Sequence, residues 1–141
     1  MKHLFRTAAV AAILTTPPVT AESIILLGSN DYAWETTPEG VAFASLQGDR
    51  FVESYQALVR LPAGTVSPPH VKTANMYGVL LQGEMIHYLS DEDPAAARRM
   101  GPGSYYSIKS GAAHVSACVS DTPCLAYLYQ DGAFDFLPVS Q

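Results

Sequence analysis

From residue 24 onward the sequence repeats one pattern, in which a short apolar or aromatic run is followed by Gly, Pro, Asp or Asn. These runs are short and helical periodicity is scarce, so the pattern predicts an all-β sandwich or barrel. The polar stretch 91–100 is expected to form one helical turn on the surface. The expected strands lie near residues 24–27, 41–46, 50–61, 65–72, 75–82, 84–90, 104–108, 113–119, 124–130 and 134–137.

The first 21 residues have the three parts of a secretory signal peptide. Lys2 and Arg6 supply the positive region, residues 8–14 are a short apolar stretch, and residues 19–21 (VTA) offer small side chains to a signal peptidase. The apolar stretch is too short to span a membrane. We therefore expect cleavage after Ala21 and a periplasmic or secreted protein; a frayed N-terminal helix is the alternative.

The remaining 120 residues suffice for one domain with a real hydrophobic core, residues 22–141. Loss of Lys2 and Arg6 changes the formal net charge from −5 to −7. Such an acidic chain lacks the basic surface that nucleic acids and anionic lipids require, and no later run is long enough for a transmembrane helix. We expect no nucleic-acid partner and no membrane association after signal cleavage.

Two segments in the middle of the chain share a glycine followed, after five residues, by a short polar motif. The first segment has its motif residues at Gly64, His70-Val71-Lys72, Met76 and Gly83. The second has them at Gly103, Lys109-Ser110-Gly111, His114 and Cys118. In order and spacing they resemble the two motifs of the cupin superfamily. The resemblance implies a single cupin double-stranded β-helix, or jelly-roll barrel. The wider layout resembles an uncharacterised branch of exported bacterial cupins.

The chain departs from the cupin pattern at the positions that the resemblance assigns to metal ligands. Cupin metal sites use two His and one Glu from the first motif and one His from the second. His70 and His114 occupy ligand positions, whereas Lys72 replaces the second His and Met76 replaces the Glu. A Lys ammonium repels a divalent ion, and a thioether is a poor ligand for Fe, Mn or Zn.

A third imidazole offers a way to restore the ligand set. A two-residue turn at Gln82-Gly83 would pair Gly78 with His87 in a hairpin, and would point Met85 and His87 inward. His70, His87 and His114 would then converge and could bind one divalent ion (Zn, Cu, Fe, Mn or Ni) with an open position. The alternative is three buried, hydrogen-bonded imidazoles in a barrel without metal.

The same reasoning predicts an interior ligand pocket, in which Lys72 has two possible roles. It could act as an activated amine or anion clamp, or it could extend to solvent at the barrel mouth. Six tyrosines are expected on sheet surfaces, since Tyr is a strong strand former: Tyr77, Tyr88, Tyr105, Tyr106, Tyr127 and Tyr129. The predicted pocket residues are His70, Lys72, Met76, His87 and His114.

The only two cysteines, Cys118 and Cys124, are close in sequence and lie in a chain with an export signal. Such a pair favours a disulfide, with two buried thiols as the alternative. If residues 120–122 form a loop, Cys118 faces Cys124 across a hairpin, within bridging reach.

Three functions remain open at the level of sequence. The first is a pocket that binds a small molecule, with or without a divalent metal. The second is a metal-dependent cupin enzyme, namely an oxygenase, lyase or isomerase, in which the metal is a Lewis acid. The third is a metal-free sensor or interaction barrel. Because cupins commonly pair their barrels, the resemblance also implies a homodimer.

Overall fold

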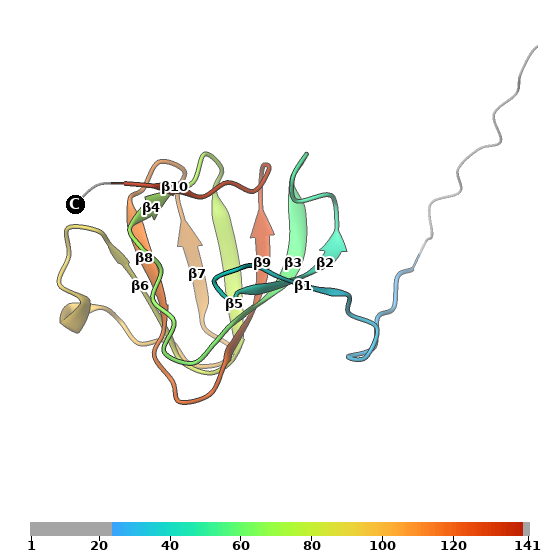
Figure 1. Ribbon diagram of the computed structural model, residues 1–141, viewed down its shortest axis with the longest axis horizontal. Coiled ribbons are helices and arrows are strands. Elements are labelled where there is room, and N and C mark those ends of the chain that lie inside the picture. The colour runs from blue at the N-terminus through green and yellow to red at the C-terminus, as the bar shows by residue number, and fades with distance from the viewer. Residues whose placement is uncertain (1–23, 140–141) are drawn as a thin grey trace, which may run out of the picture.

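The computed structural model describes residues 24–139, which form two antiparallel sheets and one 3-10 turn, η1 (Pro94–Ala96). The predicted signal peptide lies outside the described residues. Figure 1 shows the four-stranded sheet on the left and the six-stranded sheet beside it. The larger sheet has the order β1 (Trp34–Thr36), β2 (Ala42–Gln47), β3 (Tyr55–Leu61), β9 (Cys124–Gln130), β5 (Met76–Gln82) and β7 (Tyr105–Ile108). The smaller has β10 (Leu137–Pro138), β4 (His70–Val71), β8 (His114–Cys118) and β6 (Met85–Leu89).

The predicted all-β class is confirmed, and several strand boundaries are corrected. Residues 24–27 form no strand, whereas the short β1 was not predicted. The expected strand 65–72 is reduced to β4 and an isolated bridge between Val66 and Ala117. Pro68 and Pro69 lie in this segment, and a proline has no N–H to donate to a ladder.

The predicted hairpin at Gln82-Gly83 is wrong. β5 pairs with β7 and β9, whereas β6 pairs with β8 in the other sheet. The turn therefore carries the chain from one sheet to the other, with Gly83 at a φ of 82°, a conformation that glycine adopts readily. Gly78 consequently lies opposite Tyr106, and His87 lies opposite Ser116.

The core lies between the two sheets and follows the alternation of the strands. On β9, the even-numbered residues from Cys124 to Gln130 are buried, and on β5 the same holds for Met76, Gly78 and Leu80. The four-stranded sheet adds Met85 and Cys118, both at most 2% exposed. This arrangement leaves the odd-numbered residues of β5 and β9 on the outer face of the larger sheet.

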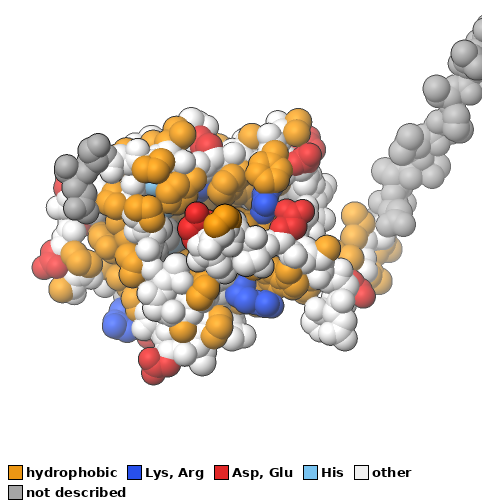
Figure 2. Space-filling model, in the orientation of Figure 1, with side chains coloured by type: hydrophobic (Ala, Val, Ile, Leu, Met, Phe, Trp, Pro, Cys, Tyr) orange, Lys and Arg blue, Asp and Glu red, His pale blue; other side chains and the backbone are white. Residues whose placement is uncertain are grey.

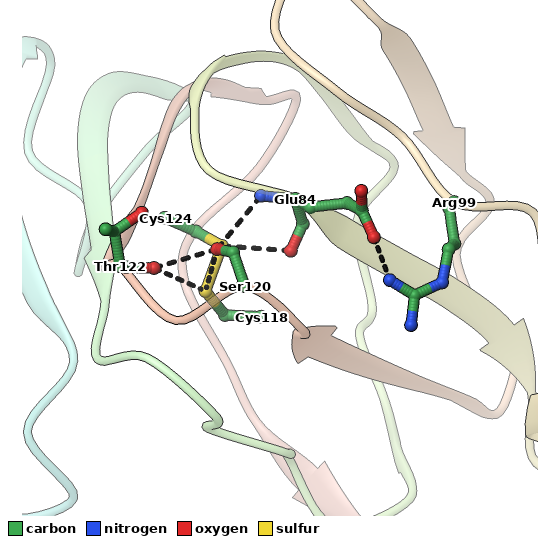
Figure 3. Close-up of polar contacts among 6 residues, drawn as sticks. All are labelled: Glu84, Arg99, Cys118, Ser120, Thr122 and Cys124. Atoms are coloured by element: carbon green, nitrogen blue, oxygen red, sulfur yellow. Dashed lines mark hydrogen bonds and ion pairs between the residues drawn. A yellow bond between two sulfur atoms is a disulfide. The ribbon is translucent and has the colours of Figure 1, made fainter.

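A disulfide joins Cys118 to Cys124, as predicted, with Cα atoms 5.8 Å apart (Figure 3). The expected hairpin geometry is wrong, because Cys118 ends β8 and Cys124 begins β9 in the other sheet. Ser120 Oγ donates to Thr122 O (2.8 Å) and accepts from Glu84 N (3.1 Å). The disulfide therefore links the two sheets at the end of the barrel where β5 also crosses into β6.

Within residues 24–139, no helix is long and apolar enough to cross a membrane.

Candidate functional site

A cavity of about 650 Å³ lies between the two sheets. Its volume falls within the range of pockets that enclose drug-sized ligands. Most of its wall is apolar and comes from β2, β3, β5, β6, β7 and β9 and the segment before β10. The apolar and aromatic lining residues are Pro38, Val41, Phe43, Val59, Leu61, Val66, Pro68, Met76, Met85, Tyr106, Ala126, Leu128, Phe134 and Phe136.

The pairing of β4 with β8 places His70 directly opposite His114, with ring centroids 4.2 Å apart. Both residues are at most 3% exposed. His70 Nδ1 lies 2.9 Å from Pro68 O, and His114 Nδ1 lies 2.9 Å from Ala112 O. A carbonyl oxygen only accepts, so each Nδ1 carries the proton and each neutral ring keeps a lone pair on Nε2.

His87 reaches the cavity from β6. Its Nδ1 lies 2.8 Å from Ser116 Oγ, and its ring centroid lies 4.3 Å from that of Tyr106. Among the described residues, neither His87 Nε2 nor His114 Nε2 has a hydrogen-bond partner, although both atoms are buried. Buried polar atoms are normally satisfied, and of these two histidines only His87 lines the cavity, so its Nε2 is a candidate partner for a polar group there.

Burial keeps the three imidazoles neutral. Desolvation, together with the neighbouring His114 and Lys72, lowers the pKa of His70 to about 4, although the hydrogen bond to the Pro68 carbonyl and the Asp135 carboxylate oppose this shift. Desolvation also lowers the pKa of His87 to about 4 and lowers that of His114. At neutral pH the three rings therefore contribute no positive charge to the cavity.

Lys72 is the one Lys or Arg side chain on the cavity lining in the part of the chain described. It is 6% exposed, and its Nζ donates to Asp135 O at 2.6 Å. Nζ also lies 4.3 Å from the centroid of the Phe134 ring. Desolvation lowers the pKa of Lys72 to about 8, opposed by the Asp135 carboxylate. Lys72 is therefore mostly protonated at neutral pH and lies inside the barrel.

Four of the five predicted pocket residues line the cavity, and one does not. His70, Lys72, Met76 and His87 line the cavity. His114 does not line it but lies in ring contact with His70. His87 faces the interior although the hairpin that placed it there is wrong, because its pairing with β8 gives it the same orientation.

Sequence reasoning missed several lining residues. Tyr106 was expected on the sheet surface, but it faces inward opposite Gly78, where a Cβ would overlap its ring. Phe134 and Phe136 come from the segment between β9 and β10, and Phe136 stacks on His70 with centroids 4.0 Å apart. The alternation of Tyr105 and Tyr106 shows that one of the two must face inward, but the sequence does not say which.

Comparison with solved structures identifies the class of fold as the cupin double-stranded β-helix. The polyketide cyclase RemF from Streptomyces resistomycificus matches with a TM-score of 0.66 and 17% identity, over 84% of this chain and 87% of RemF. An RmlC-like cupin from Shewanella frigidimarina gives 0.60 and 12%, over 77% and 92%. KdgF from Halomonas sp. gives 0.59 and 17%, over 73% and 91%. At these identities the likeness shows the fold alone.

No curated protein matches the chain by sequence. A family model described as "Domain of unknown function (DUF4437)" matches residues 41–141, most of the chain. The chain therefore belongs to the DUF4437 family, with a cupin fold.

The side chains present do not fit the metal centre that cupins commonly hold. Within residues 24–139, no three His, Cys, Asp or Glu side chains lie together so that they could hold one metal ion. In the first motif, the position of the second His is occupied by Lys72, which carries an ammonium. The position of the Glu is occupied by Met76, which carries a thioether. A buried cation beside the two imidazoles disfavours a divalent ion on electrostatic grounds. We therefore assign no metal-dependent step to this site.

Proposed function

We propose that the cavity binds a small organic acid with a largely apolar body. The observation that carries this proposal is the placement of one buried ammonium, Lys72, on an otherwise mostly apolar wall. An anionic group of the ligand would form a charge-assisted hydrogen bond with Nζ in a medium of low dielectric constant. The body of the ligand would lie against the aromatic and aliphatic lining.

The neutral imidazoles suit a second polar group of the same ligand. His70 lines the cavity, and its Nε2 lone pair is an acceptor, whereas His114 contacts the His70 ring without lining the cavity. A ligand hydroxyl near the carboxylate could donate to such an acceptor. Lys72 is the one cation among the described lining residues, and Glu39 adds a carboxylate, so the lining favours a singly charged hydroxy or enol acid over a dianion.

Binding explains the site better than general-base catalysis does. An efficient general base has a pKa near the working pH, whereas burial lowers the pKa of both His70 and His87 to about 4. For the enzyme alternatives that require a metal, residues 24–139 provide no group of three His, Cys, Asp or Glu side chains that could hold the ion. Elemental analysis of protein that has met neither a chelator nor a nickel column tests this directly. We expect no stoichiometric metal, and no rise in melting temperature with added Zn or Cu.

Titration calorimetry with a panel of aromatic and aliphatic carboxylates and their amides tests the binding proposal. Lys72→Met removes the charge and keeps much of the side-chain volume, and Lys109→Met on the exposed surface is the matched control. A hydrogen bond to a charged group contributes about 1.5–3 kcal/mol, so Lys72→Met should weaken carboxylate binding about tenfold or more. Binding of the amides should change little. Equal losses for acids and amides, or no binding by any panel member, would contradict the proposal.

The same protein is proposed to work outside the cytoplasm. The support is the signal-peptide pattern of residues 1–21, together with a cysteine pair that the fold places in a disulfide.

A further inference from the structure

Lys72 is one of only two lysines after residue 21, and the two lie in opposite environments. Lys109 is exposed directly after β7, whereas Lys72 is 6% exposed and lines the cavity. On the face seen in Figure 2, Lys and Arg side chains form only a few separate blue patches. A primary amine inside the barrel therefore differs sharply from its surface counterpart in what it can meet.

The contacts of the Lys72 ammonium leave it without a counter-ion. Nζ donates to one backbone carbonyl, Asp135 O, at 2.6 Å and lies 4.3 Å from the centroid of the Phe134 ring. The Asp135 carboxylate accepts instead from Thr73 N, at 3.2 and 3.0 Å. In the part of the chain described, Lys72 forms no ion pair. A neutral amine keeps two N–H groups, so it can still donate to Asp135 O while its lone pair is free.

Burial supplies the neutral amine that nucleophilic attack requires. Desolvation lowers the pKa of Lys72 to about 8, opposed by the Asp135 carboxylate. Roughly a tenth of these amines are then neutral at pH 7, compared with fewer than about one in a thousand for a lysine of ordinary pKa. Desolvation in an apolar pocket is a general way of activating a lysine for reaction with carbonyl compounds.

We propose, building on the proposed binding of an organic acid, that Lys72 forms a reversible imine with the carbonyl carbon of a 2-oxo acid held in the cavity. The neutral Nζ attacks the carbonyl carbon, and the π electrons move to the oxygen to give a carbinolamine. The C=N bond then forms while both protons of the nitrogen leave with the oxygen as water. The step needs no oxidant or reductant, and hydrolysis reverses it.

The rest of the cavity suits this reaction. Its mostly apolar wall keeps water scarce, which favours the imine over its hydrolysis. His70 lines the same cavity, close enough for the charge of Lys72 to lower its pKa, and its neutral ring is an acceptor for the carbinolamine hydroxyl. A protonated imine keeps a positive charge beside the carboxylate of the 2-oxo acid. A 2-oxo acid is also the keto tautomer of an enol acid, so it belongs to the ligand class proposed above.

Reductive trapping with cyanoborohydride tests this reaction on the purified protein, with phenylpyruvate as the probe. Reduction turns the imine into a stable secondary amine, so the mass of the chain should rise by that of phenylpyruvic acid less one oxygen atom. Peptide mapping should find about tenfold or more adduct on Lys72 than on Lys109, because binding raises the effective concentration only in the cavity. An excess of 3-phenyllactate, which has no carbonyl carbon to attack, should suppress the trapping.

Two arginine variants identify the reacting amine. Lys72→Arg keeps a cation but has no amine that forms an imine, so it should give no cavity adduct. Lys109→Arg is the matched control and should be trapped as the native protein is. Melting temperatures show whether both variants fold, and the peptide map of the native protein depends on neither. Equal labelling of the two lysines in the native protein would overturn the proposal.

Calorimetry with 3-phenyllactate separates the imine from the binding of acids. If phenyllactate binds in a manner that depends on Lys72 but phenylpyruvate is not trapped there, imine formation is overturned and acid binding remains. If neither acid binds while the neutral phenylacetaldehyde is trapped selectively on Lys72, imine formation is supported and acid binding is overturned.

Discussion

At the scale of single residues, three histidines of the barrel interior make the stability of the fold depend on pH: His70 and His114 are buried, and His87 is half-buried. The pKa of both His70 and His87 is lowered from 6.5 to about 4, mainly by desolvation, and that of His114 is lowered too. The unfolded chain takes up these protons first as the pH falls. The stabilisation is therefore fully present above pH 6.5 and is lost between pH 6.5 and 4, by at most about 1.4 kcal/mol per pH unit for each histidine.

Urea unfolding at a series of pH values checks this dependence. His87→Gln keeps a neutral polar side chain that does not titrate, while all carboxylates remain. The free energy of unfolding of this variant should fall less steeply with decreasing pH than that of the native protein. Identical slopes would show that His87 is not kept neutral by burial.

Gly78 is a second residue with a specific physical role. A Cβ at this position would overlap the ring of Tyr106, which lies opposite on β7. Gly78→Ala should therefore push Tyr106 toward His87 and into the cavity, at a cost of about 1–3 kcal/mol in the free energy of unfolding. Gly101→Ala is the control, since nothing lies within 4 Å of its added Cβ. Equal stabilities of the two variants in urea would contradict the overlap.

At the scale of elements, the disulfide between β8 and β9 is the covalent link between the sheets. It closes a short loop, for which chain entropy gives a stabilisation of about 2–3 kcal/mol. Adding reductant should lower the urea midpoint of the native protein to that of a Cys118→Ala/Cys124→Ala variant. The variant itself should not respond to reductant. A native midpoint that is insensitive to a reductant shown to break the bond would refute this prediction.

Local patterns predicted most of the strands but not how they pair. The residues of β5 and β9 alternate between buried and more exposed positions as expected, and the chain bends at Gly83. Whether such a turn closes a hairpin or crosses between sheets depends on contacts with β7, β8 and β9, which are remote in sequence. Turn residues in the sequence therefore do not by themselves show which strands pair or in which register.

The spacing of the two motifs predicted part of the candidate site, namely the residues that lie at motif positions. The spacing identified His70, Lys72 and His114, which the fold brings together. Phe134 and Phe136 could not be found in this way, because they reach the cavity from an irregular segment. That segment is held by remote hydrogen bonds, such as the one from Phe134 N to Arg50 O at 2.5 Å.

At the scale of the whole molecule, the predicted signal peptide ends just ahead of an exposed apolar arm, residues Ile24 to Leu27. We expect protein recovered from a bacterial periplasm to begin near Glu22, just ahead of this arm. Intact mass measurement checks this, with protein expressed in the cytoplasm as the unprocessed control. A periplasmic protein that retains Met1 would contradict the prediction.

Trp34 is the only tryptophan of the chain, and it lies in β1 at the root of the arm. Its indole packs under the Arg60 guanidinium at 4.1 Å and against Tyr32 edge-on, with centroids 6.3 Å apart. The pairing of Trp34 with Ala44 places the indole on the outer face, away from the ligand cavity. Trp34 is therefore an intrinsic fluorescence probe of the protein. Its emission should change when the barrel unfolds and remain constant when the cavity fills, so one unlabelled sample can separate unfolding from ligand binding.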